Sequence, residues 1–190
     1  MRIRWVSPLD PRITEIARYS AQLLPCLERY LGVAAVDDGA GLTEPAWWKP
    51  SEAPATPVEG VDSLPIYHIG NNPVHWPIYE LSRREPGLVV LHDLSLVDLA
   101  RHVSRELDQP DWWKQQMVRQ YGEKVAGLVH RSENSLADYI EMTSSYPLFL
   151  PFVENAIGVV VHSEHSRQAV LNRLPCGSRV IHLGLPAPPP

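Results

Sequence analysis

Six short apolar runs recur along the chain, each three to five residues long. They are Ile3–Ser7, Val33–Asp37, Ile66–Ile69, Leu88–Leu91, Val159–Val161 and Val180–Leu183. Apolar residues follow one another in these runs with little alternation, which is the pattern of strands covered on both faces. Because the intervals between most runs can hold crossover helices, the sequence predicts an α/β fold with a mainly parallel sheet between two layers of helices.

Helical spacing of apolar residues predicts the connections between these strands. One helix is expected from Ile13 to Leu31, with Asp10-Pro11 supplying its cap and first turn and Gly32 ending it. A short helix is expected over 78–84, and a helical insertion over 93–142. The last helix is expected over 163–174, with Ser163 as its cap and Glu164 in its first turn.

The length of 190 residues favours one domain, which we place at residues 1–184. Residues 37–63 contain Trp47-Trp48 and several prolines and are expected to form an irregular excursion from this domain. Residues 185–190 consist of Leu185 followed only by proline and alanine, which is typical of the start of a linker between domains.

Composition and charge narrow the functional classes. The net charge of −5 and the pI near 5.9 give no overall basic surface, so nucleic acid is not an expected partner. Two cysteines without a zinc-like spacing favour a reducing compartment. No signal peptide or membrane-length apolar stretch is visible, so we expect a cytoplasmic protein, and nothing indicates a peripheral membrane contact.

Polar side chains directly follow several predicted strands. Ligands of open parallel sheets bind beyond the carboxyl ends of the strands, so these side chains are the candidate site. They are Asn71 and Asn72 after the third strand, His92 and Asp93 after the fourth, and His162, Ser163 and Glu164 after the fifth, with Arg167 one helical turn later. His92 is the strongest candidate, because an imidazole at the end of an apolar strand has no capping duty.

A structural role stays open for the other candidates. Asp93 and Ser163 are good helix caps, and Asn71 or Asn72 can close a turn through its side chain. The pairs Trp47-Trp48 and Trp112-Trp113 could stack on a sugar, but packing in the core is the commoner use of such residues.

Several sequence motifs are absent, and their absence weakens whole classes of enzyme. No GxGxxG follows the first strand, and GxxxxGK[ST], GxSxG and HExxH do not occur, which counts against nicotinamide binding, P-loop hydrolysis, esterase and zincin chemistry. His92, His162 and His165 could be imagined as a metal site, but no acidic ligand is compelling beside them, so no metal is expected. A metal-dependent hydrolase that uses these three histidines and Asp93 stays a distant alternative.

Two segments of the chain resemble the N-terminal domain of bacterial GT-B glycosyltransferases of family 4. The first is Tyr67-His68-Ile69-Gly70-Asn71-Asn72-Pro73, followed by His75 and then by Pro86-Gly87-Leu88-Val89-Val90-Leu91-His92-Asp93. The second is Tyr146-Pro147-Leu148, followed by Gly158-Val159-Val160-Val161-His162-Ser163-Glu164 and Arg167. The likeness runs from the first strand to about Gly184. The turn Ser7-Pro8-Leu9-Asp10 departs from it, because the family often has glycines there.

The resemblance implies the Rossmann-like N-terminal half of a GT-B enzyme of carbohydrate biosynthesis. Such an enzyme transfers a sugar, with retention, from a nucleotide-diphosphate sugar to a hydroxyl of a sugar or lipid-linked acceptor, without a cofactor or metal. The donor-binding C-terminal domain is absent from this chain, so the chain alone is expected to be inactive. The E-x7-E spacing of Glu133 and Glu141 lies in the helical insertion and is interpreted as coincidence.

The same resemblance assigns roles to the candidate residues. His92 would be the catalytic residue beside the transferred sugar. The acceptor side and the border of the cleft would be formed by Asn71, Asn72, Asp93, His162, Ser163, Glu164 and Arg167. A non-catalytic α/β module that pairs with a separate donor-binding subunit is the alternative, and the hydrolase is a more distant one.

Overall fold

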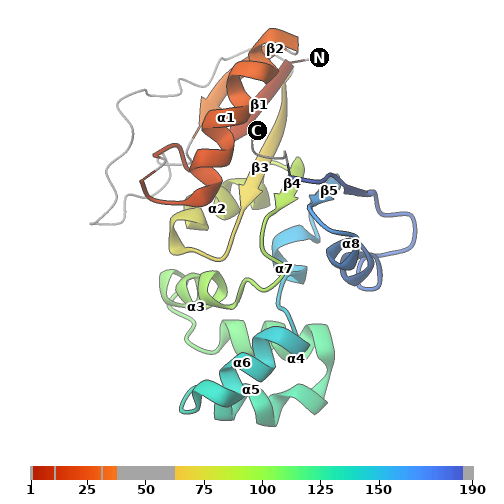
Figure 1. The fold of residues 1–190 in the computed structure, drawn as a ribbon. Coiled ribbons are helices and arrows are strands. Elements are labelled where there is room, and N and C mark those ends of the chain that lie inside the picture. The colour runs from red at the N-terminus through yellow and green to blue at the C-terminus, as the bar shows by residue number, and fades with distance from the viewer. Residues whose placement is uncertain (1, 11, 31, 38–62, 186–190) are drawn as a thin grey trace.

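The computed structural model describes residues 2–10, 12–30, 32–37 and 63–185 (Figure 1). Its strands form one six-stranded sheet in the order β2-β1-β3-β4-β5-β6, in which every neighbouring pair is parallel. The strands are β1 (Arg2–Val6), β2 (Gly32–Asp37), β3 (Ser63–Ile69), β4 (Leu88–Leu91), β5 (Gly158–Val161) and β6 (Val180–His182). The predicted α/β fold with a mainly parallel sheet is therefore confirmed.

Helices follow most of the strands, as the spacing of the apolar runs predicts. They are α1 (Glu15–Tyr30), α2 (Trp76–Arg84), α3 (Val97–Glu106), α4 (Trp112–Tyr121), α5 (Ala126–Ser132), α6 (Leu136–Ser145), α7 (Leu150–Val153) and α8 (Glu164–Leu171). Single 3-10 turns, η1 (Pro73–His75) and η2 (Glu123–Val125), precede α2 and α5. Figure 1 shows α3 to α6 gathered beyond the end of the sheet at which β4 leads into α3.

The sheet is stabilised by apolar side chains that its central strands bury completely. Val6, Tyr67, Ile69 and Val161 have no exposed surface, and burying one large aliphatic side chain contributes roughly 1.5–3 kcal/mol. The same core continues into the helices after β4, where Trp113 is buried and Trp112 packs against it. This pair therefore packs in the core, whereas Trp47-Trp48 lies outside the described residues.

Two helices begin later than their sequences predict, because other residues cap them. The helix expected from residue 13 begins at Glu15, and Thr14 Oγ1 accepts a hydrogen bond from the N–H of Ala17 at 2.9 Å. Asp10, expected to cap this helix, instead accepts one from the N–H of Arg12 at 2.9 Å. The helix expected from residue 93 begins four residues later, at α3, and is capped from another loop, as described below.

Several other boundaries shift slightly, and two predicted segments are only partly described. The last helix, expected over 163–174, ends at 171, and the third strand, expected from residue 66, begins at 63. α2 begins at residue 76 instead of 78, and the last helix of the expected insertion ends at 145 instead of 142. Of the excursion predicted at 37–63, residue 37 ends β2 and residue 63 begins β3, while 38–62 lie outside the described residues. Of the linker predicted at 185–190, only Leu185 is described.

Neither membrane crossing nor disulfide bonding is seen in the described ranges. None of the helices there combines the length and the apolar character that a bilayer span needs. Cys26 and Cys176 are both exposed and carry free thiols.

Candidate functional site

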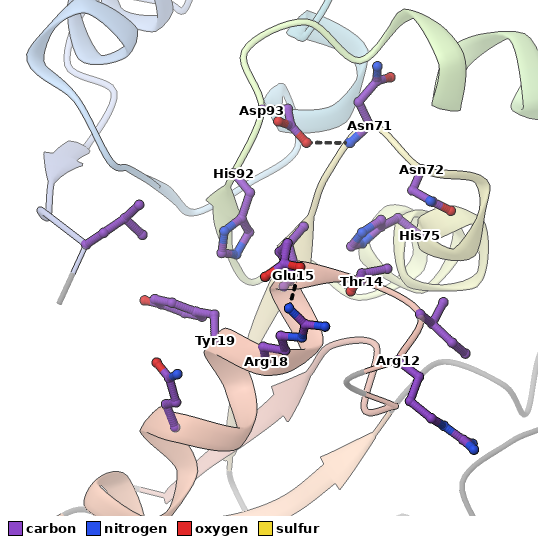
Figure 2. Close-up of a pocket in the computed structure, with 14 residues that line it drawn as sticks. Arg12, Thr14, Glu15, Arg18, Tyr19, Asn71, Asn72, His75, His92 and Asp93 are labelled. Atoms are coloured by element: carbon purple, nitrogen blue, oxygen red, sulfur yellow. Dashed lines mark hydrogen bonds and ion pairs between the residues drawn. The ribbon is translucent and has the colours of Figure 1, made fainter. Parts of the chain in front are cut away.

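A pocket of about 830 Å³, lined mostly by polar residues, lies where β3 and β4 end and α1 begins (Figure 2). Four segments supply its walls: the start of α1 with the turn before it, the loop after β3, the loop after β4, and Leu185 after β6. Its lining residues are Arg12, Ile13, Thr14, Glu15, Ile16, Arg18, Tyr19, Gln22, Asn71, Asn72, His75, His92, Asp93 and Leu185. The pocket thus lies beyond the carboxyl ends of two neighbouring strands, the place at which open parallel sheets bind ligands.

Gly70 brings the loop after β3 close to α1. A Cβ atom at this position would collide with Cδ1 of Ile16, and it would lie 3.1 Å from Oδ2 of Asp93 and 3.2 Å from Nε2 of His75. Any larger residue must push one of these side chains away. The close approach of α1 to the pocket loops therefore favours glycine here, because a side chain could enter only if the flexible end of Ile16 moved away.

Asn71 caps α3 from across the pocket loop. Its Oδ1 accepts hydrogen bonds from the N–H of Asp98 at 2.8 Å and of Leu99 at 3.2 Å, and its Nδ2 donates to Oδ2 of Asp98 at 2.9 Å. The residue before α3, Leu96, makes no side-chain cap. Asn71 lines the pocket, but its amide is already engaged in satisfying the first turn of α3.

Asn72 and Asp93 shape the same wall through backbone hydrogen bonds. Oδ1 of Asn72 accepts from the N–H of Val74 at 3.0 Å and so opens the 3-10 turn before α2. Oδ2 of Asp93 accepts from the N–H of Asn71 at 2.8 Å, which ties the loops after β3 and β4 together. Both side chains also line the pocket, so they hold its shape and face its interior.

Both arginines that line the pocket are paired with carboxylates. Arg12 donates to both carboxylate oxygens of Asp10, the shortest contact being 2.6 Å, and Arg18 donates to Oε1 of Glu15 at 2.8 Å. The guanidinium of Arg12 lowers the pKa of Asp10 to about 2. Each of these two cations therefore has an acidic partner, while Asp93 adds a carboxylate that makes no ion pair among the described residues.

Four histidines gather under the pocket at the ends of β3, β4 and β5. Nδ1 of His68 lies 2.9 Å from Nε2 of His92, and the ring centroids of His92 and His162 are 4.9 Å apart. Nδ1 of His75 donates to the backbone oxygen of His68 at 2.9 Å. The cluster therefore connects the end of β3 to the end of β4 through one imidazole pair.

These imidazoles are held neutral by burial. Desolvation lowers the pKa of His92 to about 3 and that of His75 to about 4, with neighbouring imidazoles adding to the effect at His92. Burial likewise lowers the pKa of His68 well below its ordinary value. A charged imidazole here would lose its hydration and meet other imidazoles, so at neutral pH these three rings act as uncharged hydrogen-bonding groups.

Tyr19, on α1, covers the histidine cluster. Its ring meets His92 edge-on at a centroid distance of 5.1 Å and His162 at 5.7 Å. Tyr19 also lines the pocket, and partial burial raises the pKa of its hydroxyl, which therefore stays protonated. A neutral hydroxyl can both donate to and accept from a ligand hydroxyl.

The candidates after β5 lie outside the pocket lining. Nδ1 of His162 donates to the backbone oxygen of Leu183 at 2.9 Å, although its ring still packs on His92. Oγ of Ser163 accepts from the N–H of Ser166 at 3.0 Å, which confirms its role as the cap of α8. Arg167 donates to Glu164 at 2.9 Å, and hydrogen bonds from Gln168 and Arg167 lower the pKa of Glu164.

No group of three or more His, Cys, Asp or Glu side chains in the described part of the chain is arranged to hold a metal ion. His165 lies exposed on α8. The hydrogen bonds of the His92 and His162 rings run to His68 and Leu183.

Sequence reasoning missed several residues of the site. His68 and His75 stand out in the sequence only as part of the segment that resembles the glycosyltransferase domain, and Tyr19 is one of many residues of the predicted first helix. Tyr19 carried no signal, because a tyrosine at helical spacing is usually a packing residue. One signal in the sequence points to the cluster. His68 lies inside an otherwise apolar strand and His75 follows soon after Gly70, and histidines are buried less often than aliphatic residues.

Comparison with protein-family models, with curated proteins and with solved structures finds no match for this chain.

Proposed function

We propose that the chain is the acceptor-side domain of a retaining glycosyltransferase of GT-B architecture. In this proposal the pocket at the ends of β3 and β4 receives the acceptor, and a second domain holds the nucleotide-diphosphate sugar. The observation that carries the proposal is His92, a neutral imidazole that follows an apolar strand and lines a pocket of about 830 Å³ whose residues are mostly polar.

The chemistry of the pocket suits an uncharged ligand rich in hydroxyl groups. Tyr19, Asn72 and His92 offer neutral hydrogen-bonding groups, and the nearby guanidinium groups are paired with carboxylates. A sugar hydroxyl can be bound by such groups without a cost for neutralising charge. These features support a sugar or sugar-like acceptor at this site.

The donor diphosphate needs a different environment. Its leaving group develops negative charge, which helix N-termini or cationic side chains must stabilise in a site that excludes water. Arg12 and Arg18 already serve Asp10 and Glu15, so they are poorly suited to this task. We therefore assign the diphosphate to the second domain and expect the chain alone to catalyse no transfer.

Exposed aliphatic side chains beside the pocket support a second domain or subunit at this edge of the sheet. Ile181, Leu183 and Leu185 alternate along β6 and the residues after it, and more than half of each is exposed. Leu185 also lines the pocket. The second domain of the proposed GT-B architecture would cover these three side chains. In the alternative, in which the chain is a non-catalytic module, a separate donor-binding subunit would cover them.

The proposal is tested by titrating uridine, guanosine and adenosine diphosphates into the chain by calorimetry. We expect no measurable binding, because the pocket has no cation to spare for a diphosphate. Micromolar affinity for any of the three would place the donor site on this chain and contradict the assignment of roles. Inorganic pyrophosphate serves as the control for adventitious binding of a diphosphate.

A second experiment separates the enzyme from the binding module. A protein that joins this domain to its donor-binding partner is assayed for sugar transfer, with His92→Ala as the variant and His165→Ala as the matched control. His165 is an exposed histidine that the pocket does not use. Loss of turnover in His92→Ala alone supports the enzyme, whereas equal turnover in both variants removes His92 from the reaction.

A further inference from the structure

His68 is a completely buried residue that the proposed function has not yet used. It lies on β3, and its ring stacks on Trp5 of β1 at a centroid distance of 4.0 Å. Its Nδ1 lies 2.9 Å from Nε2 of His92, while its own Nε2 is buried without a hydrogen-bond partner among the described residues. One imidazole thus supports the other from inside the fold.

The proton of the His68–His92 hydrogen bond can belong to either ring. If Nε2 of His92 donated it, Nδ1 of His68 would accept, and the single proton of the neutral His68 would be on Nε2. That N–H would then be buried with no acceptor. If Nδ1 of His68 donates instead, only a lone pair is left unpaired, which native proteins tolerate more readily than an orphaned N–H.

We infer that His68 is a positioning residue that fixes His92 as a hydrogen-bond donor to the ligand. Nδ1 of His68 donates to Nε2 of His92, so the proton of His92 is on Nδ1. Nδ1 of His92 has no hydrogen-bond partner among the described residues. Unlike Nε2 of His68 and of His75, it is not among the buried atoms without a partner, so it is the nitrogen of His92 that a ligand in the pocket can reach.

This arrangement defines what His92 does in the site. A neutral imidazole with its proton on Nδ1 donates to an oxygen of the bound molecule and does not remove a proton from it. Burial supports this role, because the pKa of His92 near 3 makes the ring a poor base at neutral pH. The identity of this oxygen as one of an acceptor or transferred sugar rests on the proposed function. The tautomer inferred for His92 is independent of it.

The backbone oxygen of His68 acts on a second histidine. It accepts from Nδ1 of His75, which fixes the proton of His75 on Nδ1 in the same way. Both histidines that line the pocket are therefore held by residue 68, one through its side chain and one through its carbonyl. Replacing the His68 side chain should release His92 and leave His75 unchanged, which provides an internal control.

The tautomers can be measured by long-range proton–nitrogen NMR on the chain labelled with 15N-histidine at pH 7. The His92→Asn variant identifies the His92 signals by their loss. We expect a pyrrole-type Nδ1 and a pyridine-type Nε2 for His92 in the unmodified chain. A proton on Nε2 of His92, or an equal mixture of the two tautomers, would overturn the inference.

Two variants test whether His68 is the cause. His68→Phe keeps a ring against Trp5 but removes the donor, and His68→Asn keeps an amide N–H near the position of Nδ1. We expect His92 to lose its single tautomer in His68→Phe and to keep it in His68→Asn, with the His75 signals unchanged in both. An unaltered His92 in a folded His68→Phe protein would refute a positioning role.

These outcomes are independent of the proposed transfer reaction. If the chain binds no sugar but His92 shows the expected tautomer, the proposed function fails and the positioning by His68 stands. If His68→Phe does not fold, His68→Leu, which also lacks a donor, replaces it in the same measurement. A role in stability alone would change the unfolding midpoint of the variants without changing the tautomer of His92.

Discussion

Replacing Asn71 by alanine should destabilise the protein more than an ordinary surface substitution does. The change removes the acceptor for the N–H groups of Asp98 and Leu99, a helix cap worth about 1 kcal/mol. It also removes the 2.9 Å hydrogen bond to the Asp98 carboxylate, which at a partly exposed site contributes about 1 kcal/mol more. The sum is about 2 kcal/mol, or a fall in Tm of roughly 4–8 °C for a chain of this size.

Urea denaturation, followed by far-ultraviolet circular dichroism, measures this loss, and two further variants make the comparison specific. Asn71→Asp keeps the acceptor for α3 but brings a second carboxylate to Asp98, so we expect it to lose part of the stability as well. Ser163→Ala removes an ordinary cap at α8 and should cost about 1 kcal/mol. A loss in Asn71→Ala no larger than that in Ser163→Ala would refute the double role of Asn71.

The remaining predictions concern the pocket and its histidines. Because burial lowers the pKa of His75 to about 4 and of His92 to about 3, the unfolded chain binds more protons than the folded one below pH 6.5. The free energy of unfolding should therefore fall as the pH is lowered from 6.5 to 5, by up to roughly 1.4 kcal/mol per pH unit for each ring. Equal urea midpoints at the two pH values would contradict this. Gly70→Ala should destabilise the protein by about 1 kcal/mol, because the new Cβ forces the flexible end of the Ile16 side chain to move, whereas Gly127→Ala on α5 meets only Nη1 of Arg131 at 3.6 Å and should be neutral or stabilising. If thermal melts show equal effects of the two glycine substitutions, the close approach at Gly70 is wrong.

The sheet could be predicted from the sequence because its signal is local. Each strand contains a short, mainly apolar run, and burial on both faces of a parallel sheet favours that pattern. The end of β4 at Leu91 and the polar residues that follow it could be placed for the same reason. Ser163 could be identified as a cap because a helix cap is read from a few neighbouring residues.

The start of α3 could not be predicted from local sequence. Its cap comes from Asn71, which precedes Asp98 by 27 residues and reaches it only because β3 and β4 are neighbours in the sheet. The local sequence therefore predicts a helix that begins at Asp93, because an aspartate is a common helix cap. Asp93 instead accepts the backbone N–H of Asn71, so both residues serve a contact that only the folded chain reveals.

The histidine cluster escaped sequence analysis for a related reason. His68 occupies a strand position that an apolar residue would fill in most sheets, and nothing in its neighbours indicates that Nε2 of His92 will lie 2.9 Å away. Tyr19 joins the site because α1 packs across the strand ends. Such contacts depend on the order of strands and on the path of α1, and not on spacing within one segment.

The most direct test of the account is to titrate neutral sugars into the 15N-labelled chain and follow its backbone and side-chain NMR signals. Glucose, galactose, mannose and N-acetylglucosamine at millimolar concentration cover the common hydroxyl arrangements. The account predicts that at least one of them shifts the signals of Tyr19, Asn72 and His92, and that His92→Ala removes these shifts while His165→Ala keeps them. Shifts confined to surfaces outside the pocket, or shifts that persist in His92→Ala, would contradict it.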